Sequence, residues 1–157
     1  MIKPINDFAS LFKTNVSLDE NLVVREQNRY FLFTDSLKKL APRRFFYGGA
    51  YLGKTVKGKF FPGLELLRMI AEKKANKVVV DKRAEWLFIC GRDVFRRGVI
   101  EVVGSSEKGD YVLVLNRRNE CLGYGRAMHD LRQGKERIVI ENVLDIGDYL
   151  RREREGP

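Results

Sequence analysis

The sequence has 157 residues and carries 30 lysines and arginines against 21 aspartates and glutamates, a formal net charge of +9. This length suits one domain or two small ones, and 44% hydrophobic residues with 11% aromatics exclude a disordered chain. A membrane-spanning helix needs about 20 mostly apolar residues, whereas the longest uncharged stretch, Phe45 to Gly53, has nine. Met1 to Phe12 also lacks the apolar run of a secretory signal. We therefore expect a folded, basic, cytoplasmic protein with no membrane partner.

The first half mixes helical and strand patterns. Pro4 begins a short helix in which Ile5, Phe8 and Phe12 have helical spacing. The clearest helix of the chain is predicted over 64–74, where apolar residues share one face. The other elements predicted here are a hairpin over 22–24 and 30–33, a helix over 35–41, and strands over 44–47 and 55–61 with a break at Gly58.

The pattern changes after Asn76 to short strands separated by glycines and polar turns. Turn signals arrive about every ten residues, which is typical of a small barrel or sandwich. The predicted strands are 77–80, 86–89, 99–103, 110–115, 121–125 and 137–143. We therefore predict an α/β fold in the α+β sense, with an N-terminal domain over 1–76 and a C-terminal β domain over 77–157.

The cysteines and the single histidine exclude several kinds of site. Cys90 and Cys121 are too few for a disulfide framework, and their apolar neighbours favour small core residues. His129 is the only imidazole, so a catalytic triad would depend on it alone, and a surface histidine is the simpler interpretation. Structural zinc usually needs four ligands, whereas this chain has one histidine and two cysteines that are far apart in sequence. We predict no catalytic residue, no metal and no cofactor.

One motif points to nucleotide binding. Residues 48–55 match the P-loop pattern G-x-x-x-x-G-K-[ST], and Asp81 follows a strand that could supply a magnesium carboxylate. A P-loop must lead directly into a helix whose amides hold the phosphates. Here the following residues alternate like a strand and include Gly58 and Pro62. We therefore expect a strand, with nucleotide binding kept as an alternative.

Most of the positive charge lies in the first half. Residues 1–76 contain 14 basic and 7 acidic residues, whereas 77–157 contain 16 and 14. Between Ser36 and Leu64 there is no acidic residue, and aromatic residues alternate with the cations. Such a segment can contact phosphates and stack on bases, or can be a solvated surface over an aromatic core. The predicted basic docking face consists of Lys38, Lys39, Arg43, Arg44, Lys54, Lys57 and Lys59.

Two arginine clusters stand out in the second half. Arg92, Arg96 and Arg97 follow Gly91 at a spacing that one helical turn would bring together. A second cluster, Arg151, Arg152 and Arg154, lies near the end of the sequence. Both could bind a nucleic-acid backbone, whereas salt bridges to nearby acids are the alternative explanation.

The residues of the second half resemble a known RNA-binding module. Trp86-Leu-Phe, Gly91-Arg-Asp-Val94, Gly109 to Val114 and Leu122-Gly-Tyr-Gly125 are similar in order and spacing to a PUA domain. With Gly53-Lys54, Lys59-Phe60, the helix from Leu64 and Asp145 to Arg151, the whole chain resembles the archaeal type of the Nip-seven ribosome-biogenesis family.

This resemblance implies a two-domain protein, with an N-terminal antiparallel sheet and helices followed by a PUA-type β pseudobarrel. It implies a non-catalytic RNA-binding factor for pre-rRNA processing and large-subunit assembly. The implied partners are rRNA or pre-rRNA, with a preference for uridine-rich single strands, and ribosome-assembly or exosome-associated proteins. Arg151 and Arg152 match the family's RNA surface, whereas Glu153 and Glu155 interrupt its basic run. An RNA-modification accessory role and a protein-protein adaptor are the remaining alternatives.

Overall fold

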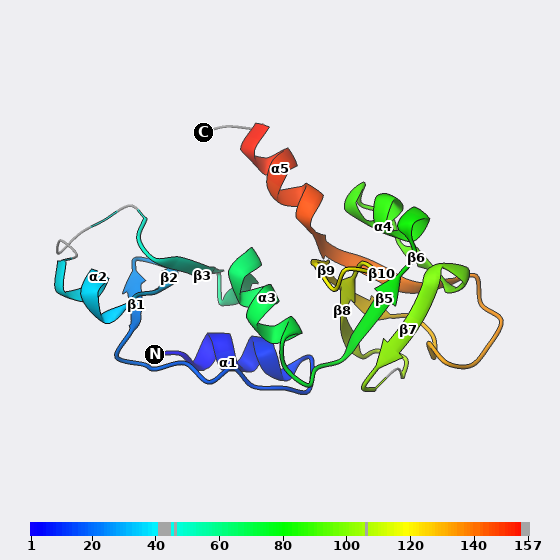
Figure 1. Cartoon of the computed structure of the whole chain (residues 1–157), viewed down its shortest axis with the longest axis horizontal. Coiled ribbons are helices and arrows are strands. Elements are labelled where there is room, and N and C mark those ends of the chain that lie inside the picture. Colours follow the sequence, from blue (N-terminus) through cyan, green and yellow to red (C-terminus); the bar gives the residue numbers. More distant parts are fainter. Residues whose placement is uncertain (41–44, 46, 106, 155–157) are drawn as a thin grey trace. The chain divides into compact units, whose positions relative to one another are not determined.

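The structure is a computed structural model that describes residues 1–40, 45, 47–105 and 107–154, with the backbone alone for 152–154 (Figure 1). The chain forms two compact units. Unit 1 contains Met1–Ser10 and Asn15–Lys73, and unit 2 contains Leu11–Thr14 and the chain from Lys74 onward. The division after Lys73 lies close to the expected domain boundary. None of the helices in the described part of the chain has the length and apolar character needed to cross a membrane.

Unit 1 is built around a four-stranded antiparallel sheet, called sheet A, with the strand order β1-β2-β3-β4. The predicted first hairpin and the helices from Asp35 and Leu64 are confirmed. The elements of unit 1 are α1 (Lys3–Ser10), β1 (Val23–Glu26), β2 (Arg29–Leu32), α2 (Asp35–Leu40), β3 (Ala50–Val56), β4 (Lys59–Pro62) and α3 (Leu64–Ala71).

The opening helix is shorter than its apolar spacing predicts. It ends at Ser10, and Lys13 has a positive φ of 57°, which is incompatible with a continuing helix. Phe12 therefore leaves the helix and packs in unit 2, where its ring centroid lies 5.5 Å from that of Tyr124. Burial, with Tyr111 nearby, raises the pKa of Tyr124 to about 12. Helical spacing alone could not show that Phe12 belongs to the other core.

The region from 44 to 62 differs from the prediction. Arg44 and Phe46 lie outside the described residues, and neither Phe45 nor Tyr47 is in a strand, so the strand over 44–47 is wrong as far as it is described. The single broken strand over 55–61 is instead the end of β3, a tight turn and β4. Lys57 and Gly58 both have positive φ, 48° and 78°, as the favoured two-residue hairpin turn requires.

The residues that match the P-loop pattern do not form a P-loop. Gly53, Lys54 and Thr55 all lie within β3, which pairs antiparallel with β2 and β4. The next helix, α3, begins only after β4. Gly53 is required for another reason, because its φ is 143° and an added Cβ would lie 2.4 Å from the carbonyl oxygen of Phe61. The motif therefore lacks the helix amides that would hold a phosphate.

Unit 2 contains a six-stranded sheet, called sheet B, with the order β6-β10-β9-β8-β5-β7. Its neighbours are antiparallel except β5 and β8, which are parallel. The elements of unit 2 are β5 (Lys77–Val80), α4 (Lys82–Ile89), β6 (Val94–Phe95), the 3₁₀ turn η1 (Arg96–Gly98), β7 (Val99–Val103), β8 (Tyr111–Leu115), β9 (Cys121–Ala127), β10 (Ile138–Asp145) and α5 (Ile146–Arg154).

Five of the six predicted strands of unit 2 are confirmed, and the strand over 86–89 is wrong because this segment belongs to α4. The Asp81 carboxylate caps the helix by accepting the backbone N–H of Ala84 at 2.8 Å. Ala84 and Phe88, one turn apart, are buried, whereas Trp86 is 64% exposed. The core beneath α4 comprises Val78, Val80, Ala84, Phe88, Val94, Val112, Val114, Leu122, Ala127, Leu131, Val139 and Ile140.

Both cysteines lie outside this core, which corrects the expectation that they are core residues. Cys90 is exposed at the end of α4, and Cys121 is half-buried at the start of β9. Neither of these two described cysteines forms a disulfide bond.

Candidate nucleic-acid interface

The most distinctive surface cluster of unit 2 forms around Phe95. The guanidinium carbons of Arg97 and Arg137 each lie 5.7 Å from the centroid of its ring, within the range of cation-π contacts. β6 pairs with the start of β10, with Phe95 opposite Ile138, and this pairing brings the two arginines together although they are distant in sequence. Both arginines are exposed, and among the described residues neither has a carboxylate partner.

Two further arginines lie near the later part of β10, one beside Asn142 and one on α5. Asn142 of β10 donates its side-chain N–H groups to the carbonyls of Phe88 and Arg92, at 2.9 and 3.2 Å, which holds the exposed Arg92 beside β10. Arg151 of α5 donates to the Ile89 carbonyl at 3.2 Å. We call Arg92, Arg97, Arg137 and Arg151 the arginine strip.

Arg151 has a structural partner as well as an exposed surface. Its Nη2 lies 3.2 Å from both carboxylate oxygens of Asp145, a side chain that is only 4% exposed. The Arg151 side chain is itself 47% exposed. It therefore neutralises a buried charge and still presents positive charge to solvent. Arg152 and Arg154 lie on the same helix, and the structure describes only their backbone.

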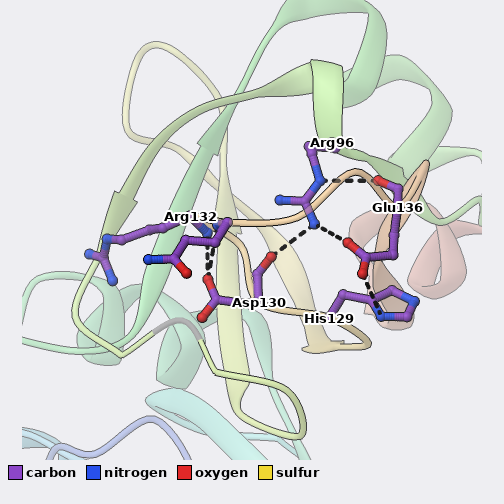
Figure 2. Close-up of polar contacts among 6 residues, drawn as sticks. Arg96, His129, Asp130, Arg132 and Glu136 are labelled. Atoms are coloured by element: carbon purple, nitrogen blue, oxygen red, sulfur yellow. Dashed lines mark hydrogen bonds and ion pairs between the residues drawn. The ribbon is translucent and has the colours of Figure 1, made fainter.

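Arg96 does not share the surface of its sequence neighbours. Its Nε donates to the Glu136 carbonyl at 3.0 Å, and its Nη2 donates to the Asp130 carbonyl and the Glu136 carboxylate, both at 2.9 Å (Figure 2). The expected single helical turn through Arg92, Arg96 and Arg97 is wrong, because β6 intervenes and only η1 is helical. Arg96 therefore acts as a positioning residue for the loop before β10.

This loop, residues 128–137, is held at several points. One carboxylate oxygen of Asp130 accepts the backbone N–H groups of Arg132 and Gln133, at 2.8 and 3.1 Å (Figure 2). The Arg132 guanidinium donates to the carbonyls of Gly104 and Val102. Together with Arg96, these contacts order the chain that delivers Arg137 to the edge of β10.

His129 lies in the same loop, with Nδ1 3.8 Å from Oε1 of Glu136 (Figure 2). Hydrogen bonding to its own backbone, followed by the nearby His129 and Arg96, lowers the pKa of the Glu136 carboxyl. The imidazole lies at the surface beside Glu136, as expected from the sequence. Among the residues that the structure describes, no three His, Cys, Asp or Glu side chains gather closely enough to hold a metal ion.

Replacing Arg96 by alanine should raise the pKa of Glu136 toward the ordinary glutamate value. The substitution removes a charge and a hydrogen bond that both favour the ionised carboxyl. A lowered carboxyl pKa stabilises the fold above the unfolded-state pKa, and this contribution is lost as the pH falls through the folded value. Carbon-detected NMR titration of Glu136 measures the change, with Arg117→Ala, an exposed substitution in the turn before β9, as the control. An unchanged Glu136 titration in the Arg96 variant would contradict this assignment.

The predicted basic docking face is only partly brought together. Lys54 and Lys59 lie on neighbouring strands of sheet A, and Lys57 is in the turn between them. Lys38 of α2 donates to the Asn21 carbonyl, and Lys39 is exposed on the same helix. Arg43 and Arg44 lie outside the described residues. The structure therefore supports a compact group only around β3 and β4.

The family model described as UPF0113 PUA domain matches residues 76–154, half of the chain. The chain belongs to the UPF0113 PUA domain family. A UPF0113 protein of Archaeoglobus fulgidus is 32% identical over 112 residues, which cover 69% of this chain and 63% of that protein. A 60S ribosome subunit biogenesis protein NIP7 homolog of Danio rerio is 26% identical over 135 residues, 80% of this chain and 75% of that protein. The resemblance to the Nip-seven family is thereby confirmed.

The fold comparison agrees with the α+β class predicted from the sequence. A conserved PUA domain protein from Thermoplasma acidophilum superposes with a TM-score of 0.53 at 22% identity, over 92% of this chain and 90% of that one. Sheet B with α4 and α5 is thus the PUA-type pseudobarrel of the UPF0113 PUA domain, and sheet A belongs to the preceding α+β unit.

The UPF0113 PUA domain therefore presents candidate residues that the sequence did not single out. Phe95 and Arg137 were missed because their contact depends on the pairing of β6 with β10. Arg96 was included with its neighbours, although its guanidinium is used within the protein. The sequence offered a signal only for Arg137, an arginine directly before the long strand β10, because nothing in it marks the two-residue β6 or its pairing with β10.

Proposed function

We propose that this protein is a non-catalytic RNA-binding factor of ribosome biogenesis, acting in the cytoplasm in pre-rRNA processing and large-subunit assembly. Two observations support this function. The second unit is a UPF0113 PUA domain, and a relative over most of the chain is named for 60S subunit biogenesis. The chain spans 63% of the length of its archaeal relative, so the role proposed concerns this chain alone.

The observation that carries the proposal is the arginine strip along the edge of β6 and β10. All four members are exposed, Arg151 by about half. Arg97 and Arg137 flank the pairing of β6 with β10, Arg92 lies beside Asn142 of β10, and Arg151 lies on α5 beside Ile89. Guanidinium groups bind phosphates in a fixed fork geometry, and Phe95 lies between Arg97 and Arg137. A strand edge with cations and a half-buried ring suits a single strand or an irregular RNA better than a duplex groove.

The proposed function also includes a class of RNA, a class of protein partner and a second basic surface. The RNA is rRNA or pre-rRNA, with uridine-rich single strands preferred, and it contacts the arginine strip together with Arg152 and Arg154. Ribosome-assembly or exosome-associated proteins are the protein partners. The group at Lys54, Lys57 and Lys59 adds a second basic surface in unit 1.

A salt titration of RNA binding tests the proposed function. The full chain should bind a fluorescein-labelled oligouridine, measured by anisotropy, more tightly than a duplex of equal charge. With about four phosphate contacts, each contributing a log-log slope near −0.7, the affinity should fall about 50-fold between about 50 and 200 mM salt. No measurable RNA affinity at low salt would contradict the proposal and favour the adaptor alternative.

Nucleotide-dependent catalysis is the alternative from another class. Lys54 lies in a strand rather than at a helix N-terminus, so the geometry favours RNA over ATP at this lysine. Saturable ATP binding that Lys54→Ala abolishes would overturn this preference.

A further inference from the structure

Sheet A has two faces of different character. On one face, Phe60 of β4 contacts Phe8 of α1 and Tyr30 of β2, with ring centroids 5.6 and 6.0 Å apart. Tyr30 is only 2% exposed, so α1 covers this face. Antiparallel neighbours that lie directly opposite each other point to the same side of a sheet. The register therefore identifies which residues occupy the other side.

The other side carries cations and rings in adjacent positions. Arg29 of β2, Lys54 of β3 and Phe61 of β4 lie opposite one another across three strands. All three are half-buried rather than buried, and the Lys59 ammonium lies 5.4 Å from the centroid of the Phe61 ring. We call Arg29, Tyr51, Lys54, Lys59 and Phe61 the open face of sheet A.

An aromatic cluster lies beside these cations. Phe31 is fully buried, and its ring centroid lies 5.6 Å from Tyr51 and 5.3 Å from Tyr47. The Tyr47 ring is 6.1 Å from that of Tyr51, and Tyr47 is 62% exposed. Phe45, whose ring centroid lies 5.3 Å from that of Phe31, and the two tyrosines cover this phenylalanine, and Tyr47 presents its ring to solvent.

The charges around the tyrosines favour an anionic ligand. Burial raises the pKa of the Tyr51 phenol, while the Arg29 charge opposes this rise. Arg29 also lies 5.6 Å from the Phe31 centroid. Three cations, Arg29, Lys54 and Lys59, share the open face with the single carboxylate that the register places there, Glu26 opposite Arg29.

This combination matches the chemistry by which strand surfaces bind single-stranded nucleic acid. Unpaired bases stack on exposed aromatic rings, and lysines beside the rings contact the backbone phosphates. An acidic protein segment could form ion pairs with the lysines, but its carboxylates would not stack on the tyrosine rings. The rings and the cations together therefore favour RNA.

We propose that the open face of sheet A, with Tyr47, is a second site for single-stranded RNA, in which bases stack on Tyr47 and Tyr51 and phosphates contact Lys54 and Lys59. This site differs from the arginine strip in both residues and chemistry, because its affinity depends on bases as well as charge. It also gives the excess positive charge of the first 76 residues a specific location.

Base stacking separates this site from general electrostatic attraction. Tyr47→Ala in the full chain should weaken oligouridine binding by at least about fivefold, the usual contribution of one stacked base. Tyr47→Phe retains the ring and should bind like the wild type. An abasic oligonucleotide of equal length and charge should bind Tyr47→Ala and the wild type equally. Leu40→Ala, another exposed apolar truncation in unit 1, is the matched control.

Further variants show whether RNA or an acidic peptide binds the open face, and whether RNA binding there is separate from binding at the arginine strip. Lys54→Ala with Lys59→Ala should flatten the log-log salt slope by about 1.4, whereas Arg68→Ala on α3 should leave it unchanged. If the wild type binds oligouridine and Tyr47→Ala binds equally well, the second site is refuted and the proposed function stands. If Tyr47→Ala loses only an acidic peptide such as oligoglutamate, the face is a protein-binding site. Absence of wild-type RNA binding would refute both proposals.

Discussion

Replacing Arg97 and Arg137 by alanine is expected to lower the affinity for single-stranded RNA about 25-fold at about 0.1 M salt. Each phosphate contact contributes a log-log slope near −0.7, so at this concentration each is worth about fivefold. Both side chains are exposed beside Phe95, and neither holds a buried acid in place. The double variant should therefore remain folded while its salt slope flattens by about 1.4.

The matched control for this variant is the pair Arg117 and Arg118. They form the exposed tip between β8 and β9, at the far end of β9 from the residues that face the start of β10. Replacing both by alanine makes the same change in net charge. Equal losses of affinity in the two double variants would show that only net charge matters, and would contradict a defined arginine strip.

Asp145→Ala is expected to destabilise the fold by about 2 kcal/mol, because the carboxylate both caps α5 and pairs with Arg151. Its Oδ1 accepts the backbone N–H of Asp148 at 3.0 Å, and both oxygens lie 3.2 Å from Nη2 of Arg151. The Arg151 side chain is 47% exposed, so solvent weakens the ion pair below the value for a fully buried one. Urea unfolding measures the loss as a lower midpoint.

Asp145→Ala should also change the affinity for RNA, and the direction of this change tests the role of Asp145. Asp145→Ala removes a negative charge, so electrostatics alone would tighten RNA binding. Loss of the cap and the Arg151 contact should instead displace the arginines of α5 and weaken binding. Glu141→Ala, which removes an exposed carboxylate from the same strand, β10, is the control and should not weaken binding. Tighter binding by Asp145→Ala would refute a positioning role for Asp145.

Local patterns predicted the elements whose signals lie within a few residues. The hairpin at Gln27, the helix from Leu64 and most strands of unit 2 follow from alternation, helical spacing and turn residues. The prediction failed at α4, where a strand was expected over 86–89. Trp86 to Ile89 is an apolar run so short that its pattern fits a strand and a helix equally well. The capping residue Asp81 was the available signal, since it lies three residues before Ala84.

The candidate sites depended on contacts that no local pattern contains. Arg137 joins Arg97 only through the pairing of β6 with β10, and β6 has two residues, too few for a periodic signal. Arg96 could not be separated from Arg97 by sequence, because its partners, Asp130 and Glu136, lie in a distant loop. The composition did predict an excess of charge in the first 76 residues, and the register of sheet A shows which of these cations share a face.

Photocrosslinking tests the central claim most directly. The full chain is irradiated in complex with an oligoribonucleotide containing 4-thiouridine, and the crosslinked peptides are identified by mass spectrometry. If RNA lies along the arginine strip, crosslinks will concentrate in residues 92–97, at Arg137 and in α5. Crosslinks confined to other parts of unit 2, such as the exposed tip at Arg117 and Arg118, would contradict the account.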